Sequence, residues 1–444
     1  MGRFKNADFL KWLYPGMHIK RWLVLLMFGM TMMGLGFAYI LREIYLTWTF
    51  PDVFYYLTLQ WIPQVGRGAM FMGVALILIV TAVWKLNHSI LSAMLPHRDG
   101  SDSMVNIIYN QRFLARGPKI VAIGGGTGLS VLLRGLKQYT TNLTAIVTVA
   151  DDGGSSGRLR RDLGVLPPGD LRNCIAALAD AEPLVHKLFQ YRFAEGSELA
   201  GHSFGNLFIV AMSGVVGNFE EAIRQTSRVL AVRGQIIPST LANVTLCART
   251  TEALTIQGES SITGLKDKGR IQEVFLLPAN PPPCPEAVSA ILDADMIVLG
   301  PGSLYTSVLP NLLVEGIRQA VIASPAVKVY VCNVATQPGE TDGFGVREHL
   351  ETIEEHMRHH IIDVVVANTN VDGALPPSAR GEPVAVDALS PNGTRLVMVD
   401  VVNDENRYHH DATKLGQALL NIYYERGQAV ATDAGAGDLV GVVD

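Results

Sequence analysis

The sequence predicts an α/β protein: a three-layer, Rossmann-like, mostly parallel sheet with helices on both faces, preceded by a transmembrane helical hairpin. Three observations predict this fold class. After Pro118, short runs rich in β-branched residues alternate with helical stretches, an order typical of parallel sheets. Glycine-rich segments follow several of these runs. The first 100 residues differ, because two long apolar stretches without charged residues dominate them.

The predicted strands and helices follow one another along the chain. We expect strands at 119–123, 143–149, 295–299, 327–332, 361–367 and 395–402. We expect helices at 127–138, 170–180, 183–192, 203–215, 219–232, 284–293, 303–322, 343–358 and 412–426. The stretch 236–280 shows short strands and little helix, and is interpreted as a β-rich insertion or an extension of the sheet. The domain is expected to span 118–428, followed by a disordered tail at 429–444.

Residues 1–95 are predicted to form a membrane anchor. The uncharged stretch 23–41 is long enough to span a bilayer as a helix. The stretch 68–85 reaches a similar length if the stem of Lys85 is included. Basic residues concentrate before the first stretch, so both ends of the hairpin are expected in the cytoplasm. This predicts a multi-pass protein of the cell membrane with a cytoplasmic globular domain and a linker at 96–117. The alternative is that the two apolar stretches form buried helices of a soluble core.

Charge and cysteine content restrict the function classes. The chain has a net charge of −5, and its first 100 residues are basic whereas the rest is acidic. An acidic domain argues against nucleic-acid binding, which requires a basic surface. The four cysteines are far apart in sequence and form no Cys-x-x-Cys pair. Free thiols in a reducing compartment are therefore expected.

A glycine-rich loop follows the first predicted strand, in "KIVAIGGGTGLSVLLRGLK" (119–137). Leu129 stands where a dinucleotide-binding fingerprint needs a third small residue, and the Walker A spacing also fails. What remains is a strand end and a helix N-terminus with unpaired N–H groups, which favours a phosphate. A tight turn without ligand is the alternative. The candidate ligand-binding residues in this loop are Gly124, Gly125, Gly126, Thr127 and Gly128.

Two adjacent acids follow the next strand, in "LTAIVTVADDGGSSGRLRRDLG". The two strands are joined through one helix, so their carboxyl ends are expected on the same edge of the sheet. Asp151 and Asp152 could there accept a ribose hydroxyl, hold Mg²⁺ against a diphosphate, or act as a base. They are therefore candidates for ligand, metal and catalytic roles, with a turn or cap role as the alternative. Further ligand candidates follow them: Gly153, Gly154, Ser155, Ser156 and Arg158.

Polar loops elsewhere add candidates for the same site. In "VLPPGDLRN" we expect Asp170 to cap a helix, as we expect of Ser203 in "GHSFGNL". Tyr305, in "GPGSLYTSVLPNLL", could stack on a base or sugar or pack at the rim of the site. These loops and "NVATQPGETDGF" contribute the ligand candidates Arg172, Asn173, His202, Asn206, Gly302, Ser303, Tyr305, Thr336 and Gln337.

The histidines between 349 and 360 do not indicate a metal site. His356 and His360 are four residues apart on one predicted helix, but no glutamate follows His356, as a zincin motif would require. Their charged neighbours indicate a solvated helix. No Ser–His–Asp order and no thiolate nucleophile stand out.

Together these motifs resemble the CofD-like superfamily, and more closely its YvcK branch of gluconeogenesis factors. The matching segments run in order over about 118–370: "IGGGTGLS", "VTVADDGGSSGRLR", "LPPGDLRN", "GHSFGNL", "GPGSLYTSVLPNLL" and "NVATQPGETDGF". The resemblance implies a three-layer α/β/α fold in the cytoplasm and binding of a UDP-sugar such as UDP-N-acetylglucosamine. It also implies regulation that links carbon metabolism to cell-wall synthesis and cell shape. The first 100 residues depart from the soluble family pattern.

Two functions follow from these observations, and whether the protein is an enzyme stays open. The first is a ligand-gated regulator, because many anion donors occur without a recognisable nucleophile. The second is a Mg²⁺-dependent transferase on a nucleotide- or phosphate-linked donor, as in the related 2-phospho-lactate transferase. NAD binding is a third reading, which the acidic pair favours and the broken fingerprint opposes. No firm cofactor is predicted, although Mg²⁺ could accompany a bound nucleotide-sugar. The expected partners are cell-wall synthesis proteins, the membrane and a second copy of the chain.

Overall fold

A computed structural model divides the chain into two compact units, residues 1–113 and 114–444. The structure describes residues 19–48, 51, 53, 56, 59, 61–94, 114–180, 183–196, 198–264, 269–371, 381–387 and 393–437. Most of the predicted linker 96–117 and the last residues of the predicted tail lie outside these ranges. The two units are described separately.

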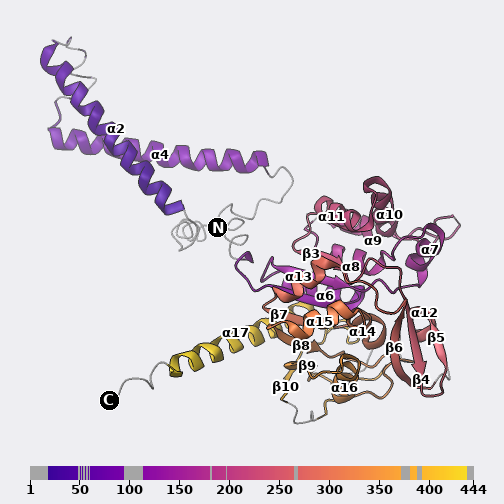
Figure 1. The fold of residues 1–444 in the computed structure, drawn as a ribbon. Helices are drawn as coiled ribbons and strands as arrows, with labels where there is room; N and C mark the ends of the chain where they lie inside the picture. The colour runs from indigo at the N-terminus through magenta and orange to yellow at the C-terminus, as the bar shows by residue number, and fades with distance from the viewer. Residues whose placement is uncertain are drawn as a thin grey trace, which may run out of the picture. The chain divides into compact units, whose positions relative to one another are not determined.

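The first unit contains two long helices, α2 (Ile19–Thr47) and α4 (Gln64–Met94) (Figure 1). Both expose bulky apolar side chains, for example Phe28 on α2 and Leu76 on α4. Over the described residues, neither helix combines the length and the apolarity that crossing a membrane requires. The predicted transmembrane hairpin is therefore not supported.

A seven-stranded parallel sheet forms the centre of the second unit. Its strand order is β10-β9-β8-β7-β1-β2-β3, and each neighbouring pair is parallel. The strands are β1 (Ile120–Gly124), β2 (Leu143–Val147), β3 (Gln235–Pro238), β7 (Met296–Leu299), β8 (Val327–Val331), β9 (Val364–Asn368) and β10 (Arg395–Val399). The predicted α/β class with a mostly parallel sheet is confirmed.

Helices cover the sheet on both faces. The strands β1, β7 and β9 are buried at every residue, as expected for strands between two helical layers. Right-handed crossovers from β1 to β2 and from β7 to β8 run in opposite directions, which places their helices on opposite faces. The helix α6 (Gly126–Leu136) packs against α8 (Gly169–Leu178) and α17 (Ala412–Gly437), and α13 (Pro285–Leu292) packs against α15 (Glu315–Ala323).

The chain order reverses between β1 and β7, which lie side by side. Open α/β sheets bind ligands beside such a switch point, at the carboxyl ends of the strands. Further helices of the second unit are α7 (Gly154–Leu163), α9 (Pro183–Gln190), α10 (Phe204–Val216), α11 (Phe219–Val229), the π-helix η1 (Leu304–Val308), α14 (Leu309–Leu312) and α16 (Val346–Met357).

The stretch 236–280 divides between two sheets. Its first residues belong to β3, the edge strand of the large sheet. The rest forms a separate antiparallel sheet, in which β4 (Thr245–Thr250) pairs with both β5 (Thr255–Gln257) and β6 (Ile271–Leu277). A short helix, α12 (Glu259–Gly264), lies between β5 and β6, and Figure 1 shows it with this small sheet at one side of the unit.

Candidate functional site

The loops after β1, β2, β7 and β8 meet at one edge of the large sheet, as predicted; we call this edge the strand-end site. The side chain of Asn333, after β8, exchanges two hydrogen bonds with the backbone of Gly302, after β7, at 2.8 and 3.1 Å. Asn311 Nδ2 donates to the carbonyl of Gly124, the last residue of β1, at 3.2 Å. These amide side chains hold the loops of neighbouring strands together.

The glycines of the first loop are required by close packing within the protein. A Cβ on Gly126 would lie 2.5 Å from the Cα of Asp170, and one on Gly128 would lie 2.3 Å from the carbonyl oxygen of Pro301. A Cβ on Gly125 would lie 2.6 Å from Ser307 Oγ. The loop is thus closed in between α8 and the segment after β7. The tight-turn alternative accounts for these glycines, and their contact with a phosphate stays a prediction.

Asp170 lies at the N-terminus of α6. The N–H of Gly126 donates a hydrogen bond to its carboxylate, which lowers its pKa, but burial and the charge of Asp151 outweigh this and raise the pKa to about 7. The expected cap role is wrong, because Asp170 lies in the first turn of α8, whose N-cap residue is Pro168. An internal carboxylate therefore takes the helix end where the sequence predicts a phosphate.

The two predicted acids have different surroundings. Asp151 Oδ1 accepts a hydrogen bond of 2.8 Å from the N–H of Gly153, and Ser156 also donates to this carboxylate. Burial nevertheless raises the pKa of Asp151. Asp152 Oδ1 accepts instead from the N–H of Ser260 in α12, at 2.9 Å. Asp151 therefore belongs to the partly buried acids of the site, whereas Asp152 attaches the small sheet to it.

Glu259, the first residue of α12, is a site residue that the sequence analysis missed. Burial raises its pKa to about 9, and the charges of Asp151, Asp170, Asp152 and Glu340 act in the same direction. Its Oε2 atom is buried and has no hydrogen-bond partner among the described residues. No local sequence signal marks Glu259, since it follows a short strand of the small sheet and not a strand of the large one.

Two arginines, half-buried Arg160 and buried Arg172, lie beside these acids. The guanidinium of Arg160 donates to the carbonyl of Val244, while its Nη1 is buried without a partner in the described part of the chain. Arg172 is only 6% exposed; it donates to Asn173 Oδ1 at 2.7 Å, and its Nε is likewise unpartnered. The charges of Asp151 and Asp152 act on Arg160, and those of Asp170 and Asp151 act on Arg172. Free N–H groups on two cations suit an anionic ligand.

Three predicted residues form a buried polar network between α7 and α10. Ser155 Oγ lies 3.0 Å from His202 Nδ1 and accepts a hydrogen bond of 3.0 Å from Asn206 Nδ2. Burial, followed by the charge of Arg158, lowers the pKa of His202. Arg158 itself donates to the carbonyl of Ala200 at 2.7 Å. These side chains lie together, as predicted. Their hydrogen bonds are mainly with one another.

Other predicted ligand-binding residues make hydrogen bonds or packing contacts within the protein. Tyr305 is 2% exposed, its ring lies edge-on to Phe344, and its hydroxyl donates to the carbonyl of Ile271. These contacts favour the alternative that Tyr305 packs within the protein, and they do not support stacking on a base or sugar. Thr336 Oγ1 accepts from the N–H of Glu382 at 2.9 Å. The hydroxyl of Ser303 donates to Glu340. Gln337 donates its N–H to Thr341 Oγ1 at 2.9 Å.

The histidine-bearing helix α16 is only partly solvated. His356 Nε2 accepts a hydrogen bond of 3.2 Å from the N–H of Val274, which joins α16 to β6. His349 is completely buried, with its Nδ1 2.7 Å from the carbonyl of Gly345. The solvated-helix interpretation is therefore wrong for His349, which is buried in the core, and His356 is half-buried against β6.

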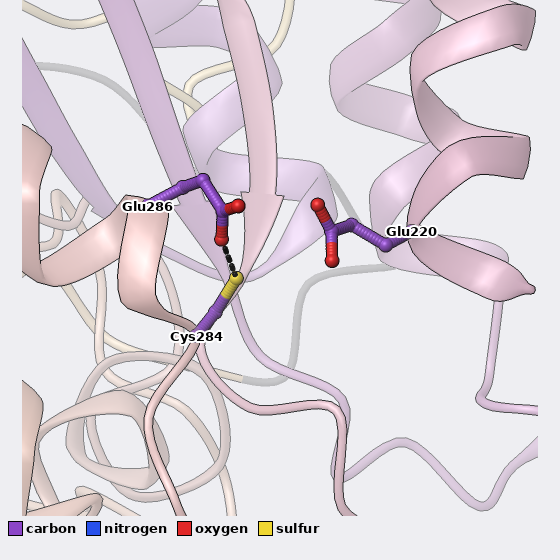
Figure 2. A group of neighbouring side chains, drawn as sticks. All are labelled: Glu220, Cys284 and Glu286. Carbon is purple, nitrogen blue, oxygen red and sulfur yellow. Dashed lines mark hydrogen bonds between the residues drawn. The ribbon is translucent and has the colours of Figure 1, made fainter.

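Glu220, Cys284 and Glu286 form a separate group near the carboxyl end of β3, with ligand atoms within 4.8 Å of one another. Figure 2 shows the thiol of Cys284 donating to Glu286, at 3.1 Å, with Glu220 facing them from α11. Burial and this hydrogen bond raise the pKa of Cys284 to about 12. Glu220 is also paired with Arg224 at 2.8 Å. A protonated thiol and a paired acid make a poor metal site.

A cavity of about 610 Å³ lies beside that group and contains none of the glycine loops. Glu220 and Arg224 line it together with Gly164, Ser213, Asn218 and Leu241. It lacks the convergent loop ends of the strand-end site, which we therefore take as the candidate functional site.

Comparison with known proteins identifies the family. Residues 120–402 match the family of 2-phospho-L-lactate transferase CofD. The chain belongs to the CofD family. A gluconeogenesis factor from Bacillus subtilis is 46% identical over 315 residues, which cover 69% of this chain and 99% of that protein. A crystal structure of a member of the UPF0052 family from Bacillus halodurans is 44% identical, with a TM-score of 0.64, and the match covers 69% of this chain and 99% of that one.

The match within the CofD family extends beyond the globular domain in some members. A protein from Nostoc sp. strain PCC 7120, named "Putative gluconeogenesis factor", is 44% identical over 427 residues, covering 94% of this chain and 93% of the relative. The chain is therefore a CofD-family protein of the gluconeogenesis-factor type. Its first 100 residues, which lie outside the family match at 120–402, are shared at least in part with this relative.

Proposed function

We propose that this CofD-family protein is a gluconeogenesis-factor-type regulator that binds a UDP-sugar, such as UDP-N-acetylglucosamine, at the strand-end site. The observation that carries the proposal is a pair of arginines at the strand-end site, half-buried Arg160 and buried Arg172. Each has a buried guanidinium nitrogen without a partner among the described residues. Unpaired buried donors on cations cost free energy, and a diphosphate would satisfy them with charge-assisted hydrogen bonds. The location supports the same ligand, because switch points are where open α/β sheets bind nucleotides.

In this proposal, ligand binding reports the supply of sugar precursors to proteins of cell-wall synthesis. A ligand can act as such a signal only if it favours one arrangement of the protein. In this proposal the small sheet with α12 is the responding segment, because the N–H of Ser260 in α12 bonds directly to Asp152 of the site. Attachment to the membrane has no support in the structure, and the proposal does not depend on it.

A Mg²⁺-dependent transferase is the second candidate. The acids with raised pKa values, Asp151, Asp170 and Glu259, favour it, since groups with perturbed pKa values collect at catalytic sites. Carboxylates are the oxygen ligands that Mg²⁺ prefers, so Asp151 and Asp152 would hold the ion. Bound there, the metal would neutralise the charge of a diphosphate.

Calorimetry on the full chain tests the regulator proposal. We expect UDP-N-acetylglucosamine to bind, and Arg160→Ala to weaken binding by about tenfold or more, the value of one charge-assisted hydrogen bond. Arg161→Ala is the matched control, because Arg161 is exposed on the same helix. If no UDP-sugar produces heat or a shift in melting temperature, the proposal is wrong.

Turnover separates the two candidates. The full chain is incubated with UDP-N-acetylglucosamine, Mg²⁺ and candidate acceptors, and released UDP or UMP is measured by chromatography. A regulator returns the ligand unchanged. Steady release above a control without protein would favour the transferase.

A further inference from the structure

Glu259 is held at the strand-end site by the contacts of its neighbours. The N–H of Ser260 donates to Asp152 Oδ1 at 2.9 Å. A Cβ on Gly258 would lie 2.2 Å from Asp152 Oδ2, and Gly258 has a φ of +94°, which only glycine adopts readily. The chain on both sides of Glu259 thus packs against the end of β2.

The carboxyl group of Glu259 lies in surroundings that do not suit a negative charge. Four acids act on it: Asp151 and Asp152 after β2, Asp170 on α8, and Glu340 in the loop after β8. Its Oε2 is buried without a partner among the described residues. An ionised Glu259 would have no partner for its charge and would be repelled by the four neighbouring acids. A protonated Glu259 is neutral and carries an O–H donor.

The arrangement of these acids favours a donor role over cation binding. Three ligand atoms within 4.8 Å of one another occur, over the described residues, only at Glu220, Cys284 and Glu286. The carboxylates around Glu259 are therefore not gathered around one point, as a cation held by all of them would require. Positive charge near the site comes from Arg160 and Arg172.

We propose that Glu259 is a ligand-binding residue that acts as a neutral carboxylic acid, donating a hydrogen bond through its O–H to an oxygen of the ligand's diphosphate. The inference rests on the proposed function for the identity of that ligand. Such an oxygen only accepts hydrogen bonds, so it pairs with a protonated acid and is repelled by a carboxylate. Because burial and the four acids raise the pKa of Glu259 to about 9, the donor persists at neutral pH.

The test compares two variants by calorimetry with UDP-N-acetylglucosamine on the full chain, at pH 7 and pH 9.5. Glu259→Gln keeps a donor of similar size that does not titrate, and Glu259→Ala removes the donor. We expect Glu259→Gln to bind within about threefold of the wild type at pH 7, and Glu259→Ala to bind about tenfold more weakly. At pH 9.5 the wild type should lose affinity relative to Glu259→Gln. Titration of the ligand itself cancels in this comparison.

Glu252→Gln is the matched control, because Glu252 is an exposed acid of the same small sheet, and it should follow the wild type at both pH values. Equal loss of affinity in Glu259→Gln and Glu259→Ala at pH 7 would overturn the donor role, and a Mg²⁺ requirement lost in both variants would identify Glu259 as a cation ligand. Absence of binding by the wild type is a different result, which overturns the proposed function and this role with it.

Discussion

The carboxylate of Asp152 accepts a hydrogen bond of 2.9 Å from the backbone N–H of Ser260, 108 residues further along the chain. The donor is one of the first N–H groups of α12, which have no partner within the helix. Asp152 therefore caps a helix of the small sheet from the end of a strand of the large one. The two adjacent acids of the sequence have separate roles: Asp152 positions α12, and Asp151 lies among the partly buried acids of the site.

Asp152→Ala is expected to loosen α12. It removes the acceptor for the N–H of Ser260, a loss comparable to that of an N-cap and worth about 1 kcal/mol of unfolding free energy. Urea unfolding should show this decrease, and amide hydrogen exchange at 259–264 should become faster. Asp152→Asn keeps an oxygen acceptor and should leave exchange near the wild-type rate. Similar exchange in Asp152→Ala and the wild type would contradict the capping role.

Gly126→Ala is expected to destabilise the fold. Its Cβ would lie 2.5 Å from the Cα of Asp170, which belongs to the backbone of α8 and cannot move aside as a side-chain tip can. Overpacking of this kind costs about 1–3 kcal/mol. Gly214→Ala on α10 is the control, since nothing lies within 4 Å of its Cβ, and it should be neutral or stabilising by up to about 1 kcal/mol. Equal urea midpoints for the two variants would show that the glycine loop after β1 can move enough to accommodate the Cβ of Gly126→Ala.

Asp170 gives the stability of the protein a defined pH dependence. Its folded-state pKa is about 7, whereas an unfolded aspartate has a pKa of about 3.9. The folded protein keeps the proton over this interval and the unfolded chain loses it, so the contribution of Asp170 to wild-type stability falls as pH rises from about 4 to 7. Asp170→Asn does not titrate and should gain stability relative to the wild type over that interval, by up to about 4 kcal/mol.

Urea unfolding of the wild type and Asp170→Asn at pH 4.5, 5.5, 6.5 and 7.5 measures this difference. Asp162→Asn is the control for replacing a carboxylate by an amide, because Asp162 is exposed on α7. If the difference in unfolding free energy between Asp170→Asn and the wild type stays constant over these pH values, the folded protein does not hold a proton on Asp170.

The sequence predicts the large sheet well where local pattern determines the strand. The runs in β1, β7 and β9 are continuously apolar because both faces are covered, and such runs are recognisable without knowledge of their partners. The four residues of β3 have no such signal, since their place depends on pairing with β2. The segment that forms α7 has the composition of a loop, but Ser155 and Ser156 bond to α10 and α8 and stabilise it as a helix.

The location of the site is predictable, whereas its chemistry is less so. Parallel strands bring their carboxyl ends to one edge, so the meeting of the loops follows from the strand order. Glu259 could not be predicted, because its place beside Asp151 and Asp170 depends on how the small sheet docks through Asp152. Tyr305 was ambiguous for a similar reason: only the packing of Phe344 against its ring shows that it lies in the core.

The four cysteines are expected to resist modification in the folded protein. Cys174, Cys247, Cys284 and Cys332 are all buried. Burial raises the pKa of Cys284 and of Cys332 to about 12, so the reactive thiolate is scarce as well as inaccessible. Ellman's reagent at pH 8 should detect fewer than one rapidly reacting thiol per native chain and about four after unfolding in guanidinium. Rapid reaction of the native protein, abolished by Cys284→Ser, would show instead that the cavity beside Glu220 admits the reagent to the thiol of Cys284.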